Sequence, residues 1–208
     1  MHRALVLAVV LSPTLGHADV DWSKGLMTAP GVGLADRQAP NPAVARGPAR
    51  RRAEDAARAT LSAQLAALPI AGGGAVKDRL GDPAVKARID TAVAGAFVVS
   101  ADPETDGSWR VTMAVGLDAI RQAMSGGPRA LAASDGAPVA TVVEGVTVTP
   151  ALGYAIGGLA AATVFVTEVP AWAKSAPRIK ARGVKGAAID ADVGKATAAT
   201  LFLILAKG

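Results

Sequence analysis

The 208-residue sequence contains no cysteine, and its two histidines, His2 and His17, both lie near the N-terminus. Beyond that point the chain has neither an imidazole nor a thiol, which excludes a Ser-His-Asp triad, a cysteine nucleophile and a Cys/His zinc site. Aromatic residues make up only 3% of the chain, too few for the stacking platforms of nucleic-acid-binding proteins. Several common enzyme classes are therefore excluded, and nucleic acid is a poor candidate partner.

Residues 1–18 have the pattern of a secretory signal peptide. Arg3 precedes an apolar run over residues 4–11, and the small residues Gly16 and Ala18 stand where signal peptidase requires them. The run is too short to cross a bilayer, and without a following cysteine there is no lipobox. We expect cleavage after Ala18 and a periplasmic chain, in peripheral contact with the outer membrane at most. The alternatives are a short anchor or a buried helix.

The chain is mildly basic, with a formal net charge of +5, and its one tight basic cluster is Arg50, Arg51 and Arg52. One interpretation is a surface that binds lipid phosphates or another subunit. The spacing favours ion pairs on a solvated helix face, with Arg50 facing Glu54 and Arg51 facing Asp55 at i, i+4.

Residues 49–68 are predicted to form the longest helix. They are rich in alanine and other strong helix formers, and the Gly47-Pro48 pair either begins this helix or kinks a longer one that starts near Asn41. A 3.6-residue period places the following small and apolar side chains on one face: Ala53, Ala57, Leu61, Leu65 and Leu68.

A glycine pair precedes this helix. Leu26 and Met27 indicate a short strand, and Gly31-Val32-Gly33 follows them. The third glycine of a dinucleotide-binding loop is missing. We therefore interpret the pair as a flexible turn from strand to helix.

Two shorter helices and a hairpin are predicted next. Asp82-Pro83 is a good N-cap and first-turn pair for a helix that ends near Ala94, and residues 117–124 form a third helix. Between them, a strand from Phe97 turns at residues 102–107 into a return strand with alternating inward positions. These positions are Trp109, Val111, Met113 and Val115.

The chain is thus predicted to be an α+β protein in two parts. In residues 19–125, helices are predicted to pack on one face of a small antiparallel sheet. Residues 126–138 are rich in Gly, Ala, Ser and Pro and are predicted to be a linker. Residues 139–208 form a small, β-rich and antiparallel domain. Its β-prone runs are 139–148, 162–167, 178–183 and 200–206.

Two apolar stretches of the second part are candidate contact surfaces. The run around Phe202 and Ile204 is apolar on both faces, so it is either a central strand or a subunit contact. Val146 and Val148 are expected on neighbouring strands. Edge strands of small antiparallel sheets tend to pair with other chains, so we expect a homo-oligomer or a complex with envelope machinery.

The segment 145–167 carries no charge and is long enough for a membrane helix. Pro150 and several glycines favour strand, turn and strand instead. A single-pass membrane helix is kept as an alternative.

No motif for catalysis, metal binding or a cofactor is predicted. The four glutamates are scattered, and a glycosidase would need a carboxylate pair at a fixed separation. Asp190 and Asp192 could offer two oxygens to calcium, but the further acidic positions of a calcium loop are missing.

Several segments together have a pattern found in known envelope proteins. In the first half these are the signal pattern, Gly31-Val32-Gly33, the helix segment 49–58, and the hairpin Asp106-Gly107-Ser108-Trp109-Arg110-Val111-Thr112-Met113. In the second half they are Gly145-Val146-Thr147-Val148-Thr149-Pro150-Ala151-Leu152 with Ile156, and residues 177–186. With these segments the sequence resembles LPP-type outer-membrane lipoproteins and FlgP-type flagellar envelope proteins. The resemblance implies a non-catalytic structural or assembly component of the cell envelope, associated with the flagellum. The alternatives are a periplasmic module that binds an envelope ligand, a carboxylate-dependent secreted enzyme and the single-pass membrane protein.

Overall fold

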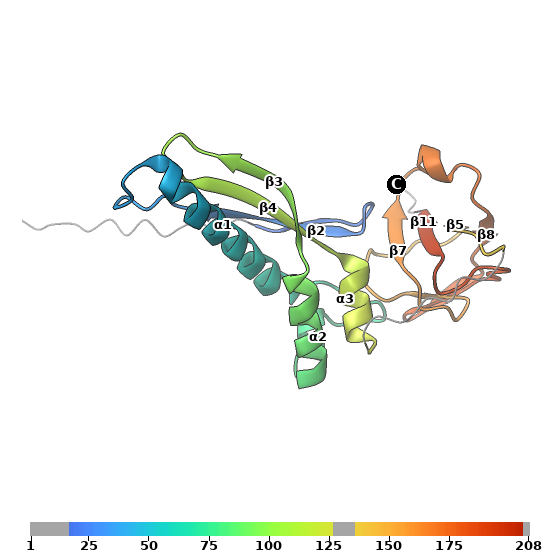
Figure 1. Cartoon of the computed structure of the whole chain (residues 1–208). Helices are drawn as coiled ribbons and strands as arrows, with labels where there is room; N and C mark the ends of the chain where they lie inside the picture. Colours follow the sequence, from blue (N-terminus) through green and yellow to red (C-terminus); the bar gives the residue numbers. More distant parts are fainter. Residues whose placement is uncertain (1–16, 127–135, 206–208) are drawn as a thin grey trace, which may run out of the picture.

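The computed structural model describes residues 17–126 and 136–205 (Figure 1). The first sixteen residues of the expected signal peptide lie outside the described residues. Residues 127–135 of the expected linker lie outside them as well, as does Ala206 at the end of the last β-prone run.

The first half is an antiparallel sheet covered on one face by a long helix (Figure 1). The strand order is β1-β2-β4-β3, and every neighbouring pair is antiparallel. The strands are β1 (Asp19–Asp21), β2 (Leu26–Gly33), β3 (Phe97–Pro103) and β4 (Trp109–Gly116). The expected layer of helices on a small antiparallel sheet is therefore present.

The long helix α1 spans Pro42–Leu65 and keeps Pro48 in its interior. The Asn41 side chain caps it by accepting a hydrogen bond from the backbone N–H of Val44 at 3.1 Å. Of the two starts that the sequence allowed, the longer helix is the one observed. Its predicted inner face is buried, with Ala53, Ala57, Leu61, Leu65 and the later Leu68 at most 4% exposed.

Gly31 and Gly33 lie in strand β2, directly beneath α1, so the predicted flexible turn is wrong. A Cβ atom on Gly31 would lie 2.1 Å from the carbonyl oxygen of Ala53, and one on Gly33 would lie 1.8 Å from that of Ala49. Glycine is needed because the helix backbone approaches the strand this closely. The contact joins segments far apart in the sequence.

The other helices of the first half begin and end almost where the sequence predicts. Helix α2 (Pro83–Ala94) is capped by the Asp82 carboxylate, which accepts from the backbone N–H groups of Ala84 and Val85. Helix α3 (Leu117–Met124) directly follows β4, and a short 3₁₀ helix, η1 (Val76–Arg79), precedes α2. Helices α2 and α3 lie side by side at one end of the sheet (Figure 1).

The second half contains two small sheets rather than one antiparallel domain. The larger has the order β7-β11-β5-β8 and is parallel throughout. Its strands are β5 (Ala140–Glu144), β7 (Thr163–Val166), β8 (Arg178–Lys180) and β11 (Leu201–Leu205). The antiparallel expectation fails here because the four strands are joined by long connections that return each strand in the same direction.

The smaller sheet has the order β6-β10-β9. Its strands are β6 (Ala155–Ile156), β9 (Gly183–Lys185) and β10 (Ala188–Asp190). A further 3₁₀ helix, η2, spans Ala171–Ala173.

The uncharged segment 145–167 is described throughout and contains β6 and β7 joined by turns. No helix among the described residues combines the length and the apolar character needed to cross a membrane.

The two halves pack against each other through specific side chains and backbone groups. Trp22, in the turn between β1 and β2, contacts the cores of both halves, and its ring meets Phe165 edge to face at 5.8 Å. The backbone N–H of Phe165 donates to the Trp22 carbonyl oxygen at 3.0 Å. Arg121 of α3, 9% exposed, donates to the carbonyl oxygen of Ala160. The boundary between the halves is therefore a packed contact.

Candidate functional site

The arginine cluster lies on the surface of α1 and makes local contacts. Arg50 Nε donates to Glu54 Oε1 at 3.1 Å, as the spacing predicts. Asp55 instead pairs with Arg58 at 3.3 Å, so the expected pair of Arg51 with Asp55 is wrong. Arg51 makes no ion pair with any residue that the structure describes.

Arg52 extends away from its neighbours and donates to the backbone carbonyl oxygen of Leu34 at 2.6 Å. This contact ties the segment after β2 to the helix. The cluster is thus dispersed into structural contacts and does not converge on one binding point.

Three of the four apolar residues proposed as a contact surface are buried in the chain's own core, and the fourth, Val148, is half-buried against it. Phe202 and Ile204 are 0% exposed because β11 is a central strand between β7 and β5. Val146 is 7% exposed, and Val148 packs against the same cluster. Both valines follow β5 in an irregular segment rather than lying on neighbouring strands. Of the two roles allowed for the Phe202 strand, the central strand is the one observed.

An exposed apolar surface that the sequence did not point to lies on β3. Phe97, Val98 and Val99 are 51%, 38% and 55% exposed. Strand β3 is at the edge of its sheet and pairs with β4 alone among the described strands. The run of three consecutive apolar residues is a sequence signal for this exposed surface. The periodicity of a hairpin, however, does not indicate which of its strands lies at the edge of the sheet.

Phe97 also marks the sheet face that α1 leaves uncovered. It pairs with Ala114 of β4, which in turn pairs with Thr28 of β2, so these residues share one face. Val32, 48% exposed, lies on the same face two pairs farther along. Val32 pairs with Arg110 of β4, so it is a separate exposed apolar side chain on the open face.

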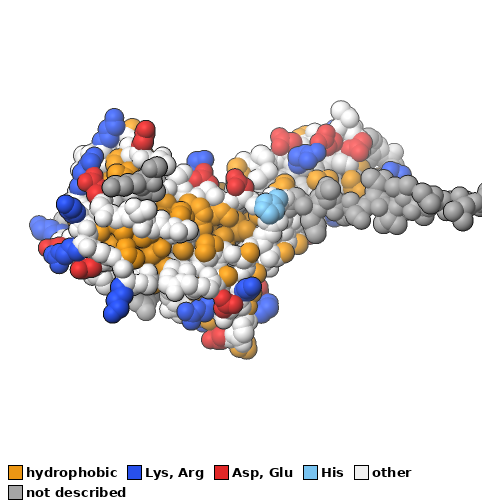
Figure 2. Space-filling view, turned by 180° about the vertical axis from the view of Figure 1, so that it is seen from behind, with side chains coloured by type: hydrophobic (Ala, Val, Ile, Leu, Met, Phe, Trp, Pro, Cys, Tyr) orange, Lys and Arg blue, Asp and Glu red, His pale blue; other side chains and the backbone are white. Residues whose placement is uncertain are grey.

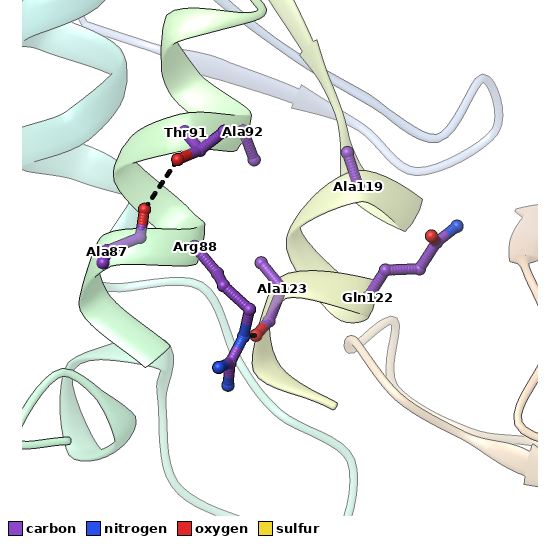
Figure 3. Close-up of a pocket in the computed structure, with 7 residues that line it drawn as sticks. All are labelled: Ala87, Arg88, Thr91, Ala92, Ala119, Gln122 and Ala123. Atoms are coloured by element: carbon purple, nitrogen blue, oxygen red, sulfur yellow. Dashed lines mark hydrogen bonds between the residues drawn. The ribbon is translucent and has the colours of Figure 1, made fainter. Parts of the chain in front are cut away.

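A second apolar feature is a hollow of about 350 Å³ between α2 and α3 (Figure 3). At one end, Arg88 Nε donates to the carbonyl oxygen of Ala123 at 2.7 Å and fixes the two helices together. Thr91 turns its hydroxyl to the carbonyl oxygen of Ala87. The walls are mostly alanine methyl groups, so the hollow suits an apolar group.

The glutamates that might form an acid-base pair are separated in the structure. Glu54 pairs with Arg50, Glu104 lies 3.8 Å from Arg110, and Glu144 pairs with Arg178 at 2.7 Å. Among the described residues no three His, Cys, Asp or Glu side chains come together as metal ligands.

Two aspartates have perturbed pKa values, and both hold turns. Hydrogen bonding by the Ser23 hydroxyl and then by Lys24 lowers the pKa of Asp21 to about 2. The backbone N–H and hydroxyl of Ser108 lower the pKa of Asp106. The Ser108 hydroxyl also accepts from the backbone N–H of Ala35 and links the hairpin turn to the segment after β2.

Comparison of the sequence with protein-family models and with curated proteins found no match.

Proposed function

We propose that this chain is a non-catalytic, exported component of the cell envelope that works by assembling with further copies of itself. The observation that carries the proposal is the apolar edge strand β3. An edge strand presents a row of backbone N–H and C=O groups that can pair with another strand. Phe97, Val98 and Val99 add exposed apolar area to this row.

The occupant of this edge is a second copy of the chain. Two antiparallel β3 strands related by a two-fold axis would extend each four-stranded sheet through a self-complementary contact. Charged residues and proline usually block the pairing of edge strands. The first five residues of β3 include neither. The pairing of β3 with β4 shifts register between Val98 and Ser100, and the apolar side chains of Val98 and Val99 are exposed there.

Export and envelope location are supported by the signal pattern of residues 1–18, and the link to the flagellum by the sequence resemblance. The packed boundary between the halves fits a rigid building block. Partner recovery after crosslinking in intact cells would separate self-assembly from attachment to larger envelope machinery.

The test of self-assembly is the molar mass by light scattering of the purified protein at micromolar concentration. We expect a dimer or larger species that becomes monomeric in Val99→Lys, because a charge on the edge opposes strand pairing. Val44→Lys is the matched control, since Val44 is equally exposed at 55% but lies on α1. A wild-type monomer at all concentrations would overturn the proposal.

The non-catalytic part is tested by replacing single carboxylates with amides. The variants Glu54→Gln, Glu104→Gln, Glu144→Gln and Glu168→Gln should each leave the cellular phenotype unchanged. Loss of the phenotype in one folded variant would point to an enzyme.

A second candidate function, a periplasmic module that binds an envelope ligand, is favoured by the hollow between α2 and α3. Filling it with Ala119→Trp would abolish capture of an apolar ligand while leaving the molar mass unchanged. Under the assembly proposal, the same variant has no effect on envelope phenotype.

A further inference from the structure

A cationic cleft of about 480 Å³ lies at the far end of the second half. It opens between strand β8 and the segment that follows β10, and proline and apolar side chains such as Ile179 and Val193 form part of its wall. Four basic side chains line it: Arg178, Lys180, Arg182 and Lys195. In the space-filling view, Lys and Arg side chains at the end formed by the second half lie interspersed with Asp and Glu side chains (Figure 2).

Thr141 is one of the residues that line the cleft, and its buried hydroxyl has no hydrogen-bond partner among the described residues. Thr141 lies in β5 and is 1% exposed. Buried hydroxyl groups are normally hydrogen-bonded, and one left without a partner destabilises the fold. A valine of the same shape would avoid this loss. The unpaired hydroxyl therefore points to a group that binds there.

The charges of the lining residues are only partly neutralised within the protein. Arg178 pairs with Glu144 at 2.7 Å, and Arg182 lies 3.9 Å from Asp190. Lys180 and Lys195 make no ion pair with any part of the chain that the structure describes. The one carboxylate in the lining, Asp192, accepts a hydrogen bond from the backbone N–H of Gly194. Two lysines are thus available to an anion from outside.

We propose that this cleft binds a phosphate group, with the Thr141 hydroxyl as a buried donor and Lys180 and Lys195 as the charge partners. A phosphate group has several oxygens that can accept from donors on different sides, whereas a carboxylate has two. The apolar wall fits a phosphate that is attached to a larger molecule as well as a free one. This inference goes beyond self-assembly, because it concerns a ligand at the opposite half of the chain from β3.

The test is a calorimetric titration of the full protein with inorganic phosphate, and a flotation assay with phosphatidylglycerol vesicles against phosphatidylcholine vesicles. Binding of inorganic phosphate identifies free phosphate as a ligand, and binding only to the anionic vesicles identifies a lipid headgroup. Either result supports the cleft if the variants below behave as expected. No binding in either assay would overturn the proposal.

Thr141→Val is the decisive variant because it removes the hydroxyl without changing charge or shape. We expect the affinity for the bound probe to fall about tenfold or more, the range for hydrogen bonds to charged groups. Thermal stability should stay the same or rise, since an unpartnered polar group is lost. Wild-type affinity in the folded variant would overturn the assignment.

The charge partners are tested with the double variant Lys180→Gln/Lys195→Gln. Its matched control is Lys77→Gln/Lys174→Gln, which removes two exposed lysines outside the cleft with the same change in net charge. We expect binding to be lost in the first and kept in the second. Equal losses in both would show general attraction to a basic protein and would overturn the proposal.

Discussion

The guanidinium carbon of Arg50 lies 5.4 Å from the centre of the Trp109 ring. Arg50 belongs to α1 and Trp109 begins β4, so this contact joins the helix to the sheet at the boundary with solvent. The same guanidinium donates to Glu54. The first arginine of the cluster therefore has a structural contact on two sides.

Trp109→Ala is expected to lower the free energy of unfolding by about 3 kcal/mol, near the lower end for deletion of a large aromatic. The ring is partly exposed and packs against the core beneath α1, as the hairpin alternation predicts. Chemical denaturation measures the loss. A change below about 1 kcal/mol would mean that the ring contributes little packing.

A double-mutant cycle that combines Trp109→Ala with Arg50→Gln separates the contribution of the Arg50 cation to stability from that of Trp109 packing. We expect a coupling energy of about 0.5 to 1 kcal/mol between Arg50 and Trp109, as for cation-π pairs at exposed sites. A matched cycle with Arg51→Gln should give no coupling.

Gly33→Ala is expected to destabilise the protein by about 3 kcal/mol or more, beyond the usual range for an overpacked site. The new methyl group would meet the Ala49 carbonyl oxygen of a helix that cannot move without losing its other contacts. Gly116→Ala is the control, because Gly116 lies in the same sheet and a Cβ there meets nothing within 4 Å. Thermal unfolding of the two variants should therefore differ strongly, and similar melting temperatures would contradict the close approach of α1.

The turn between β1 and β2 is expected to lose stability in acid. The pKa of Asp21 is lowered from 3.8 to about 2 in the folded chain, so the ionised carboxylate stabilises the fold above about pH 4. This stabilisation is lost as the pH falls through 2. The difference in melting temperature between wild type and Asp21→Asn should be largest near neutral pH and disappear near pH 2. Asp36→Asn, in another exposed turn, is the control for a general change in charge.

The mature N-terminus is expected to be Asp19, because Gly16 and Ala18 satisfy the cleavage rule. The remaining chain would begin at the first residue of β1, which pairs with Thr28. Intact mass of the exported protein checks this. A chain that keeps Met1 in the periplasmic fraction would contradict it.

Local patterns in the sequence were enough to predict the helices and the hairpin. The Asp82-Pro83 pair predicts the start of α2, and the alternation of apolar residues predicts that Val111 and Met113 are buried. Both signals can be read from the sequence because capping and burial periodicity depend on residues a few positions apart. The β-prone runs also cover the four strands of the larger parallel sheet, but not their pairing, and they miss β6 and β10 of the smaller sheet. Strand β11 pairs with β5 and β7, and nothing in its own residues identifies these partners.

The candidate surfaces were harder to predict for the same reason. The apolar pattern around Phe202 and Ile204 fits either a subunit contact or a central strand. Which of the two applies depends on the strands that pair with β11. Gly31 and Gly33 have the composition of a turn, and only the helix above them shows why they are glycine. In the sequence, nothing distinguishes Thr141 from other threonines in strands; only the three-dimensional structure shows that it lines the cleft.

The position of β11 between β5 and β7 has a consequence for how the protein folds. Each of the two strands that flank it is synthesised earlier and has no parallel partner on that side until β11 arrives. The centre of the larger sheet can therefore close only when β11, the last strand in the chain, has been added between β5 and β7. The first half has no such delay, because its sheet and helices are complete by α3, and it can act as the template on which the second half closes.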